Sequence, residues 1–156
     1  MRRRSDLEVL PGSILRRYSA SESNELANQW LATFGGNGAP STKAYMWHVL
    51  SYQAYPSVSM REAYSQYQQQ FAQSFVVLSN HRDQAIETNV RPTSCSDSDF
   101  FVFPPNMAWT MSFTHEDGWI GPYFAKHHQY DQLNQENLKK IEKALAIERA
   151  KQKGWA

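Results

Sequence analysis

The clearest alternation of large and small side chains in the chain runs from residue 108 to residue 115. A two-residue period rich in aromatic and β-branched side chains is typical of a half-buried strand. The Asp-Gly pair that follows predicts a tight turn, because glycine supplies the positive φ that short hairpin loops need. Residues 119–125 then return as the partner strand. One face of the first strand carries Trp109, Met111, Phe113 and His115, and the other carries Thr110, Ser112 and Thr114.

Two further apolar runs predict the rest of the sheet. Residues 75–79 form a short continuous apolar segment, which is typical of a buried central strand. Residues 100–104 form a second one and end in a Pro-Pro-Asn corner. The segment between them, residues 80–99, is polar and contains Pro92, so it predicts a long surface loop with a short helix near residues 83–87.

Helical periodicity precedes these strands. Leu26, Trp30 and Phe34 recur at every fourth residue and predict a helix over residues 22–34, with Ser21 at its N-cap. Two further helices are expected, over residues 42–52 and 60–73, and the second opens with a capping box formed by Ser59 and Glu62.

A long helix is predicted over residues 131–153. Leu138, Ile141 and Leu145 form a narrow apolar stripe, and Glu148 occupies the position where the next apolar residue is due. We therefore expect this helix to pack on the sheet rather than to pair as a coiled coil. Helices followed by a run of strands favour an α+β fold: N-terminal helices, a small antiparallel sheet of three or four strands, and a long C-terminal helix packed on the sheet.

Length and composition indicate one globular domain preceded by a short basic segment. The chain has 156 residues, of which 41% are hydrophobic and 20% charged, as is usual for a soluble domain. Residues 1–20 are interpreted as a basic N-terminal arm, and residues 21–156 as a single α+β domain. Asp6 and Glu8 interrupt the arm, which favours a solvated terminus over a phosphate-binding one. Its arginines are Arg2, Arg3, Arg4, Arg16 and Arg17.

Charge and hydropathy indicate the compartment and the class of partner. The net charge of +1 gives no general attraction to nucleic acid, and basic residues do not interleave with the aromatic strands. No apolar run approaches the roughly 20 residues that a membrane span needs, and no apolar segment follows the basic start as in a signal peptide. Cys95 is the only cysteine, so an intrachain disulfide is excluded. We expect a cytoplasmic protein with no membrane or nucleic-acid partner.

Histidines and carboxylates concentrate around the hairpin. His115, Glu116, Asp117, His127 and His128 lie close together in sequence, and such side chains serve in metal sites and in acid–base catalysis. The hairpin, however, separates His115 from His127 by about eight residues at ~3.3 Å each. Since no spaced metal-ligand motif is present, we expect no metal and no cofactor.

An enzymatic alternative remains open. In this interpretation His115 and Glu116 form an acid–base pair, with His81 or a metal as a further participant. The sequence does not settle which end of the sheet His81 approaches. No Gly-x-Ser-x-Gly motif is present, and Cys95 lies in an acidic loop that raises the pKa of a thiol, so no activated nucleophile is found.

The region around the hairpin resembles a known family. The resemblance rests on Trp109-Thr110, on Phe113-Thr114-His115-Glu116 and on Gly121-Pro122-Tyr123-Phe124, preceded by Phe101-Val102-Phe103-Pro104. This block is similar to the C-terminal block of a family of small bacterial proteins described as a domain of unknown function, and it covers residues 100–126. The resemblance implies a bacterial origin and a cytoplasmic location. It carries no established activity and therefore transfers no catalytic residues.

The function predicted from these observations is binding of a protein partner. Aromatic side chains are typical interface anchors, and the acidic turn is suited to a basic partner. We expect a small bacterial protein-binding module, an immunity or antitoxin-like or regulatory factor, that acts through the aromatic and acidic hairpin. The predicted contact residues are Trp109, His115, Glu116, Asp117, Trp119 and Tyr123.

Overall fold

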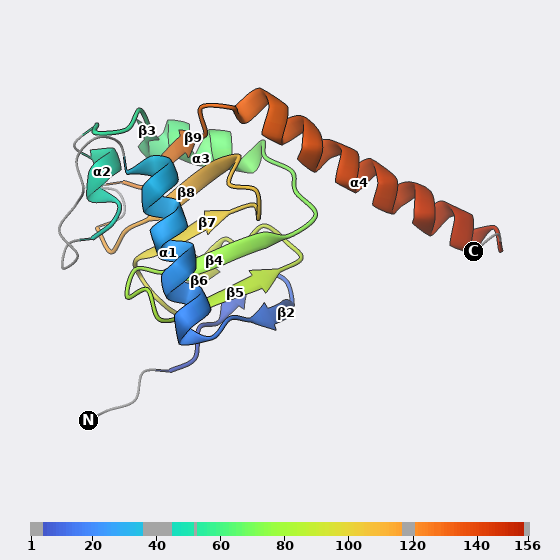
Figure 1. The fold of residues 1–156 in the computed structure, drawn as a ribbon, viewed down its shortest axis with the longest axis horizontal. Coiled ribbons are helices and arrows are strands. Elements are labelled where there is room, and N and C mark those ends of the chain that lie inside the picture. The colour runs from blue at the N-terminus through green and yellow to red at the C-terminus, as the bar shows by residue number, and fades with distance from the viewer. Residues whose placement is uncertain (1–4, 36–44, 52, 117–120, 155–156) are drawn as a thin grey trace.

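The computed structural model describes residues 5–35, 45–51, 53–116 and 121–154. They form an α+β fold built on a seven-stranded sheet with the order β2-β5-β4-β7-β8-β9-β3, in which neighbouring strands pair antiparallel (Figure 1). A separate two-stranded sheet pairs β1 with β6. The predicted fold class is confirmed, but the prediction of three or four strands is wrong. The large sheet contains β2 (Ile14–Arg17), β3 (Val58–Ser59), β4 (Phe75–Ser79), β5 (Ala85–Thr88), β7 (Phe100–Phe103), β8 (Trp109–Phe113) and β9 (Tyr123–Lys126); the small one contains β1 (Val9–Leu10) and β6 (Ser94–Cys95).

The missed strands are short, and most of them pair with segments that are distant in sequence. Residues 85–88 were expected in a loop or short helix, but they form β5, between β2 and β4. A four-residue strand is too short to show its period, so its partners decide its conformation. Within the segment interpreted as a basic arm, residues 9–10 form β1 and residues 14–17 form β2. Arg16 pairs with Glu22, and Arg17 donates to the carbonyl of Leu7.

The helices differ from their predicted bounds because of local capping. Helix α1 (Ala20–Phe34) starts earlier than expected, since Ser19 rather than Ser21 is its N-cap. The Ser19 hydroxyl accepts the Glu22 N–H at 3.1 Å, and the Glu22 carboxylate accepts the Ser19 N–H at 2.9 Å. Of the second predicted helix, the described part contains α2 (His48–Ser51).

Helix α3 (Met60–Gln68) is shorter than predicted, and its predicted capping box is wrong. Ser59 occupies the N-cap position but makes no side-chain capping hydrogen bond. Met60 has a positive φ of 56°, and its N–H donates to the carbonyl of Pro122 at 3.0 Å. The first turn of α3 is therefore held by the backbone before β9 rather than by Ser59.

Both faces of the sheet are covered, one by α1 and α2 and the other by α3 and the N-terminal segment (Figure 1). Strand β8 was predicted to be half-buried, but its residues are buried on both faces. On the α1 side, the indole N–H of Trp30 donates to the hydroxyl of Thr110 at 2.9 Å in the core. This hydrogen bond satisfies the polar side chain of Thr110 within the core.

Helix α4 (Tyr130–Gln152) projects from the body instead of packing on the sheet (Figure 1), so that prediction is wrong. Its first turns are attached: the Tyr130 hydroxyl donates to Gln70, and the Asn106 amide donates to the Leu133 carbonyl. Further along, Leu145 is 53% exposed. The faces of the sheet are occupied by the other helices, which leaves the narrow stripe of α4 uncovered. None of the helices in the described part of the chain has the length and apolarity to cross a membrane.

Candidate functional site

At one end of the strands, the sheet carries polar residues that are distant in sequence but close in space. Ser79 pairs with Phe100, and Phe100 pairs with Phe113, so the end of β4, the start of β7 and the end of β8 lie side by side. The residues just beyond these pairs therefore meet. Asp99 precedes β7, and His115 follows β8 by two positions.

The Asp99 carboxylate accepts several hydrogen bonds at this end of the strands. Its side chain is 10% exposed. Oδ1 accepts the indole N–H of Trp47 at 3.0 Å and the backbone N–H of His115 at 3.1 Å. The Ser98 hydroxyl donates to Oδ2 at 3.3 Å. A buried carboxylate is tolerated when donors surround it, and these donors connect β7, β8 and the segment before α2.

The imidazole of His115 is oriented by Asp99. Nδ1 lies 3.0 Å from both carboxylate oxygens, and the side chain is 38% exposed. The hydrogen bond to Asp99 raises the pKa of His115, partial burial acts in the opposite direction, and the charge of Glu116 contributes to the increase. With Nδ1–H donated to Asp99, Nε2 lies on the Glu116 side, 3.8 Å from Oε1.

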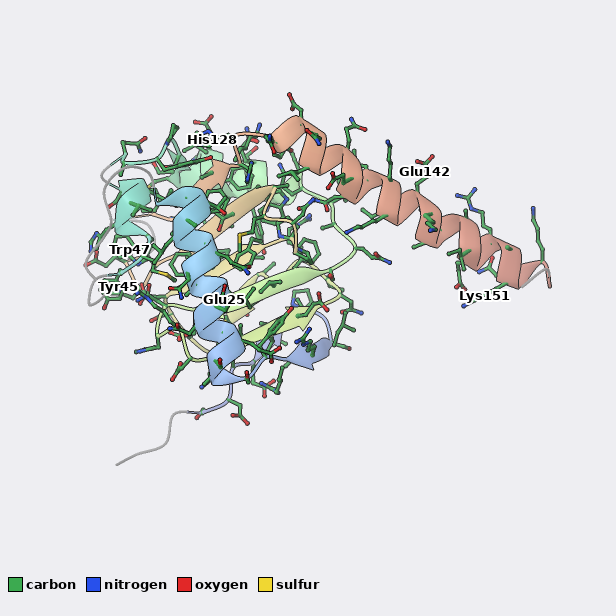
Figure 2. The ribbon with its side chains drawn as sticks, viewed as in Figure 1. Glu25, Tyr45, Trp47, His128, Glu142 and Lys151 are labelled. Carbon is green, nitrogen blue, oxygen red and sulfur yellow. The ribbon has the colours of Figure 1, made fainter. Side chains whose placement is uncertain are left out.

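Aromatic rings support the histidine from the α2 side. Trp47 is 2% exposed and stacks against Tyr45, with ring centroids 5.3 Å apart, and against Tyr123 at 6.2 Å. Tyr45 is 39% exposed, and its ring lies 5.0 Å from that of His115. His48 lies 4.4 Å from Trp47. Tyr45 and Trp47 lie on the α2 side of the molecule, away from α4 (Figure 2).

We call the exposed part of this arrangement the His115 surface, made by Tyr45, His48, His115 and Glu116. The main chain next to Tyr45 is anchored as well, because the N–H of Met46 donates to the side-chain oxygen of Asn80 at 2.9 Å. Buried residues thus hold three exposed groups in place: an aromatic ring, an imidazole of raised pKa and a carboxylate. The arrangement can donate or accept a proton at Nε2, and it can form polar and stacking contacts with another molecule.

The structure brings together only part of the predicted contact set. His115 and Glu116 lie on the His115 surface. Trp109 is completely buried among Tyr67, Phe75 and Phe124, and this placement takes it out of any contact surface. Its large ring faces the core because α3 covers that side of β8.

Tyr123, also predicted as a contact residue, is 8% exposed and stacks beneath Trp47. Burial and the nearby charge of Glu116 raise the pKa of its hydroxyl. Tyr123 therefore supports the surface from below. Asp117 and Trp119, the remaining predicted contacts, lie outside the described residues.

The other histidines lie elsewhere. The N–H of His127 donates to the carbonyl of Ala108 at 2.9 Å, at the end of the β8–β9 hairpin opposite to His115, as the hairpin geometry predicted. His81 lies in the turn between β4 and β5, and its N–H donates to the Ser79 hydroxyl. Within the described ranges, no group of three His, Cys, Asp or Glu side chains is placed to hold a metal ion.

Cys95 is an unsuitable nucleophile. Burial raises the pKa of its thiol to about 11, and the charge of Asp97 acts in the same direction. The sequence predicted the direction of this shift from the acidic loop alone, whereas the main cause is burial.

Residues 23–124 match the family model described as Domain of unknown function (DUF4275). The chain belongs to the DUF4275 family. The match covers more than half of the chain and extends the resemblance seen around residues 100–126 toward the N-terminus. Neither the curated proteins nor the solved structures give a match to the chain.

The DUF4275 match contains the whole His115 surface together with Trp47 and Asp99, which support it. It leaves out β1, β2 and α4. The candidate site is therefore part of the DUF4275 domain itself, while the projecting helix follows the matched region.

The sequence carries a signal that links Asp99 to His115. An aspartate directly before one strand and a histidine two residues after the next strand of the same hairpin lie at the same end of an antiparallel pair. Tyr45 and Trp47 had no such signal, because their position depends on the path of the chain between α1 and α2.

Proposed function

We propose that this chain is a small protein-binding module that contacts its partner through the His115 surface. One observation carries the proposal: exposed side chains are held in place by buried ones. Asp99 fixes His115 through Nδ1, and Trp47 supports Tyr45 by stacking. Side chains that are already ordered lose less conformational entropy on binding, which favours tight association.

The chemistry of the surface indicates what kind of partner fits. Tyr45 offers a ring of the type that often anchors interfaces, and Glu116 offers a carboxylate whose side chain is 40% exposed. His115 adds a donor at Nε2 when it is protonated. We propose a partner whose contact patch combines a basic side chain with an apolar one, bound by a cytoplasmic bacterial factor of the immunity, antitoxin-like or regulatory kind.

The test is a capture experiment with matched double variants. Tagged wild-type chain is incubated with nuclease-treated lysate of the source organism, and the bound protein is quantified. Removing two anchors with Tyr45→Ala plus Glu116→Ala is expected to weaken capture by at least about tenfold, which corresponds to 1.4 kcal/mol. The control, Lys126→Ala plus His128→Ala, alters the opposite end of the hairpin and is expected to capture as the wild type does.

Two results would contradict the binding proposal. Capture by the Tyr45 and Glu116 variant at the wild-type level, with an unchanged circular dichroism spectrum, would show that the His115 surface is not the contact. Loss of all captured material after nuclease treatment would point to nucleic acid instead of protein.

A specific observation also favours a second candidate, acid–base catalysis. A carboxylate hydrogen-bonded to Nδ1 orients an imidazole so that Nε2 can exchange a proton with a substrate, and here Asp99 has that role for His115. The pair differs from the predicted one, since Asp99 rather than Glu116 orients the ring.

The catalytic candidate is tested with a panel of ester, amide and phosphate-ester substrates. Any turnover is expected to fall about 100-fold or more in His115→Gln, the usual contribution of a general acid or base. The matched variant His128→Gln is expected to keep it. Equal turnover by wild type and His115→Gln would exclude His115 as the catalyst.

A further inference from the structure

A groove lies at the other end of the β8–β9 hairpin, with a volume of about 360 Å³. It forms because β3 pairs with β9 only at Val58 with Phe124 and at Ser59 with Tyr123. Residues 55–57 diverge from the last residues of β9, and the space between the two segments is the groove. Pockets of this volume are at the lower end of those that hold small ligands.

The groove combines an apolar floor with a rim of hydrogen-bond donors. Pro56 and Val58 contribute accessible apolar surface above the buried Phe124 and Ala125, and Lys126, His127 and His128 contribute the polar rim. Among the described residues that line the groove, none is Asp or Glu. An anion entering it would meet donors without meeting a carboxylate.

The hydrogen bonds of His127 define which proton it carries. Its Nδ1 accepts the backbone N–H of Gln129 at 2.9 Å, so the proton of the neutral ring is on Nε2. Burial lowers the pKa of His127, and the neighbouring His128 acts in the same direction. His127 therefore contributes a neutral N–H donor at neutral pH.

Two hydroxyls that line the groove are used within the protein. The Tyr55 hydroxyl donates to the carbonyl of Lys126, and the Ser57 hydroxyl donates to the carbonyl of Leu50. The ring of His128 lies 5.1 Å from that of Tyr55. The ammonium of Lys126 lies 4.5 Å above the ring of Tyr130, at the start of α4. One lysine and the Nε2–H donor of His127 match a monoanion better than a phosphate dianion.

We propose that this groove binds a small organic carboxylate with an apolar body, of about the size of benzoate. The carboxylate contacts the rim formed by Lys126, His127 and His128, and the body covers Pro56 and Val58. The proposal is independent of the His115 surface, which lies at the other end of the hairpin. Either can fail without the other.

The test follows the imidazole signals of the full chain by nuclear magnetic resonance while sodium benzoate is added. We expect saturable shifts for His127 and His128, and none for His115. Benzamide has the same shape as benzoate but no charge, so it loses a charge-assisted contact. Acetate keeps the charge but has no ring to bury. We expect each to bind about tenfold more weakly than benzoate. Benzoate is also expected to raise the pKa of His127, because a bound anion favours the charged imidazole.

Matched lysine variants complete the test. Lys126→Gln is expected to weaken benzoate binding about tenfold, and Lys140→Gln, which removes an exposed lysine of α4, is expected to leave it unchanged. Three results would overturn the proposal. The first is no saturable shift up to about 10 mM benzoate, a concentration at which even a weak site is detected. The others are binding of benzamide or acetate as tight as that of benzoate, and equal benzoate binding by the two lysine variants.

Discussion

The two ends of the β8–β9 hairpin each carry a histidine, and the two histidines have opposite environments. Nδ1 of His115 faces the buried carboxylate of Asp99, which raises the pKa of the ring. Nδ1 of His127 accepts a backbone N–H, and burial together with His128 lowers its pKa. The two imidazole pKa values are therefore shifted in opposite directions by their surroundings: a carboxylate raises that of His115, whereas burial and a second histidine lower that of His127.

This difference gives one sheet two distinct surfaces. The His115 end offers an imidazole of raised pKa beside Glu116 and an exposed aromatic ring, which suits contact with a protein. The His127 end offers an imidazole of lowered pKa and one lysine beside apolar residues, which suits a small anion. The predictions below test this contrast, starting with the largest expected effect.

Replacing Asp99 removes the group on which the contrast depends. In Asp99→Ala the indole N–H of Trp47 loses its buried acceptor, and an unpaired buried donor costs about 1–3 kcal/mol. We expect the free energy of unfolding, measured by urea denaturation, to fall by about 2 kcal/mol. Asp6→Ala, at an exposed position, is the control and is expected to change it by less than about 0.5 kcal/mol. Equal effects of the two variants would mean that the hydrogen bonds of Asp99 do not stabilise the fold.

Gly121 controls the entry to β9 at the His115 end. Its φ is +80°, and an added Cβ would lie 2.9 Å from the Cγ2 of Thr114. We expect Gly121→Ala to lower the free energy of unfolding by about 1–2 kcal/mol through strain and crowding. Gly154→Ala is a matched control, because Gly154 also has a positive φ, +75°, but no atom within 4 Å of the added Cβ. If both variants cost the same, the close approach to Thr114 has no effect on stability.

The two histidines should give stability opposite dependences on pH. The pKa of His115 is raised in the fold, so its contribution is complete below the unfolded value near 6.5 and is lost as pH rises through the folded pKa. The pKa of His127 is lowered, so its contribution is complete above the unfolded value and is lost as pH falls through the folded pKa. Urea denaturation between pH 5 and pH 8 measures both.

Single substitutions separate the two contributions. In His115→Gln, the decline of stability above about pH 6.5 should be smaller than in the wild type. In His127→Gln, the decline below that pH should be smaller. The same change in both variants, or the reverse pattern, would contradict the assigned environments.

The smallest effect is expected in α4, which starts at the His127 end. Leu145 is 53% exposed, so Leu145→Ala should change the free energy of unfolding by less than about 0.5 kcal/mol. Leu78→Ala, in the core at β4, should cost about 2–5 kcal/mol by comparison. A loss above about 1 kcal/mol in Leu145→Ala, dependent on protein concentration, would mean that another copy covers this helix.

The hairpin was predictable from sequence because its signals are local. The alternation through residues 108–115 predicted β8, and the expected return strand placed His115 and His127 at opposite ends of the hairpin. The short buried run at residues 75–79 likewise predicted β4. In each of these segments the pattern within the strand agrees with its role in the sheet.

Features that depend on distant partners were not predictable in this way. The hydroxyl of Thr110 is buried because Trp30, 80 residues away in sequence, donates to it. Strand β5 has one distant partner, β2, and the stripe of α4 is uncovered because other helices occupy the sheet. The support of Tyr45 and Trp47 for His115 is of the same kind.

The most direct test of the account is a titration of the histidine signals by nuclear magnetic resonance in the wild type and in Asp99→Asn. The account predicts that the pKa of His115 lies above the ordinary value near 6.5 and that of His127 below it, and that the substitution lowers the pKa of His115 only. If the two histidines titrate together, or if His115 is unchanged in Asp99→Asn, the proposed role of Asp99 is wrong.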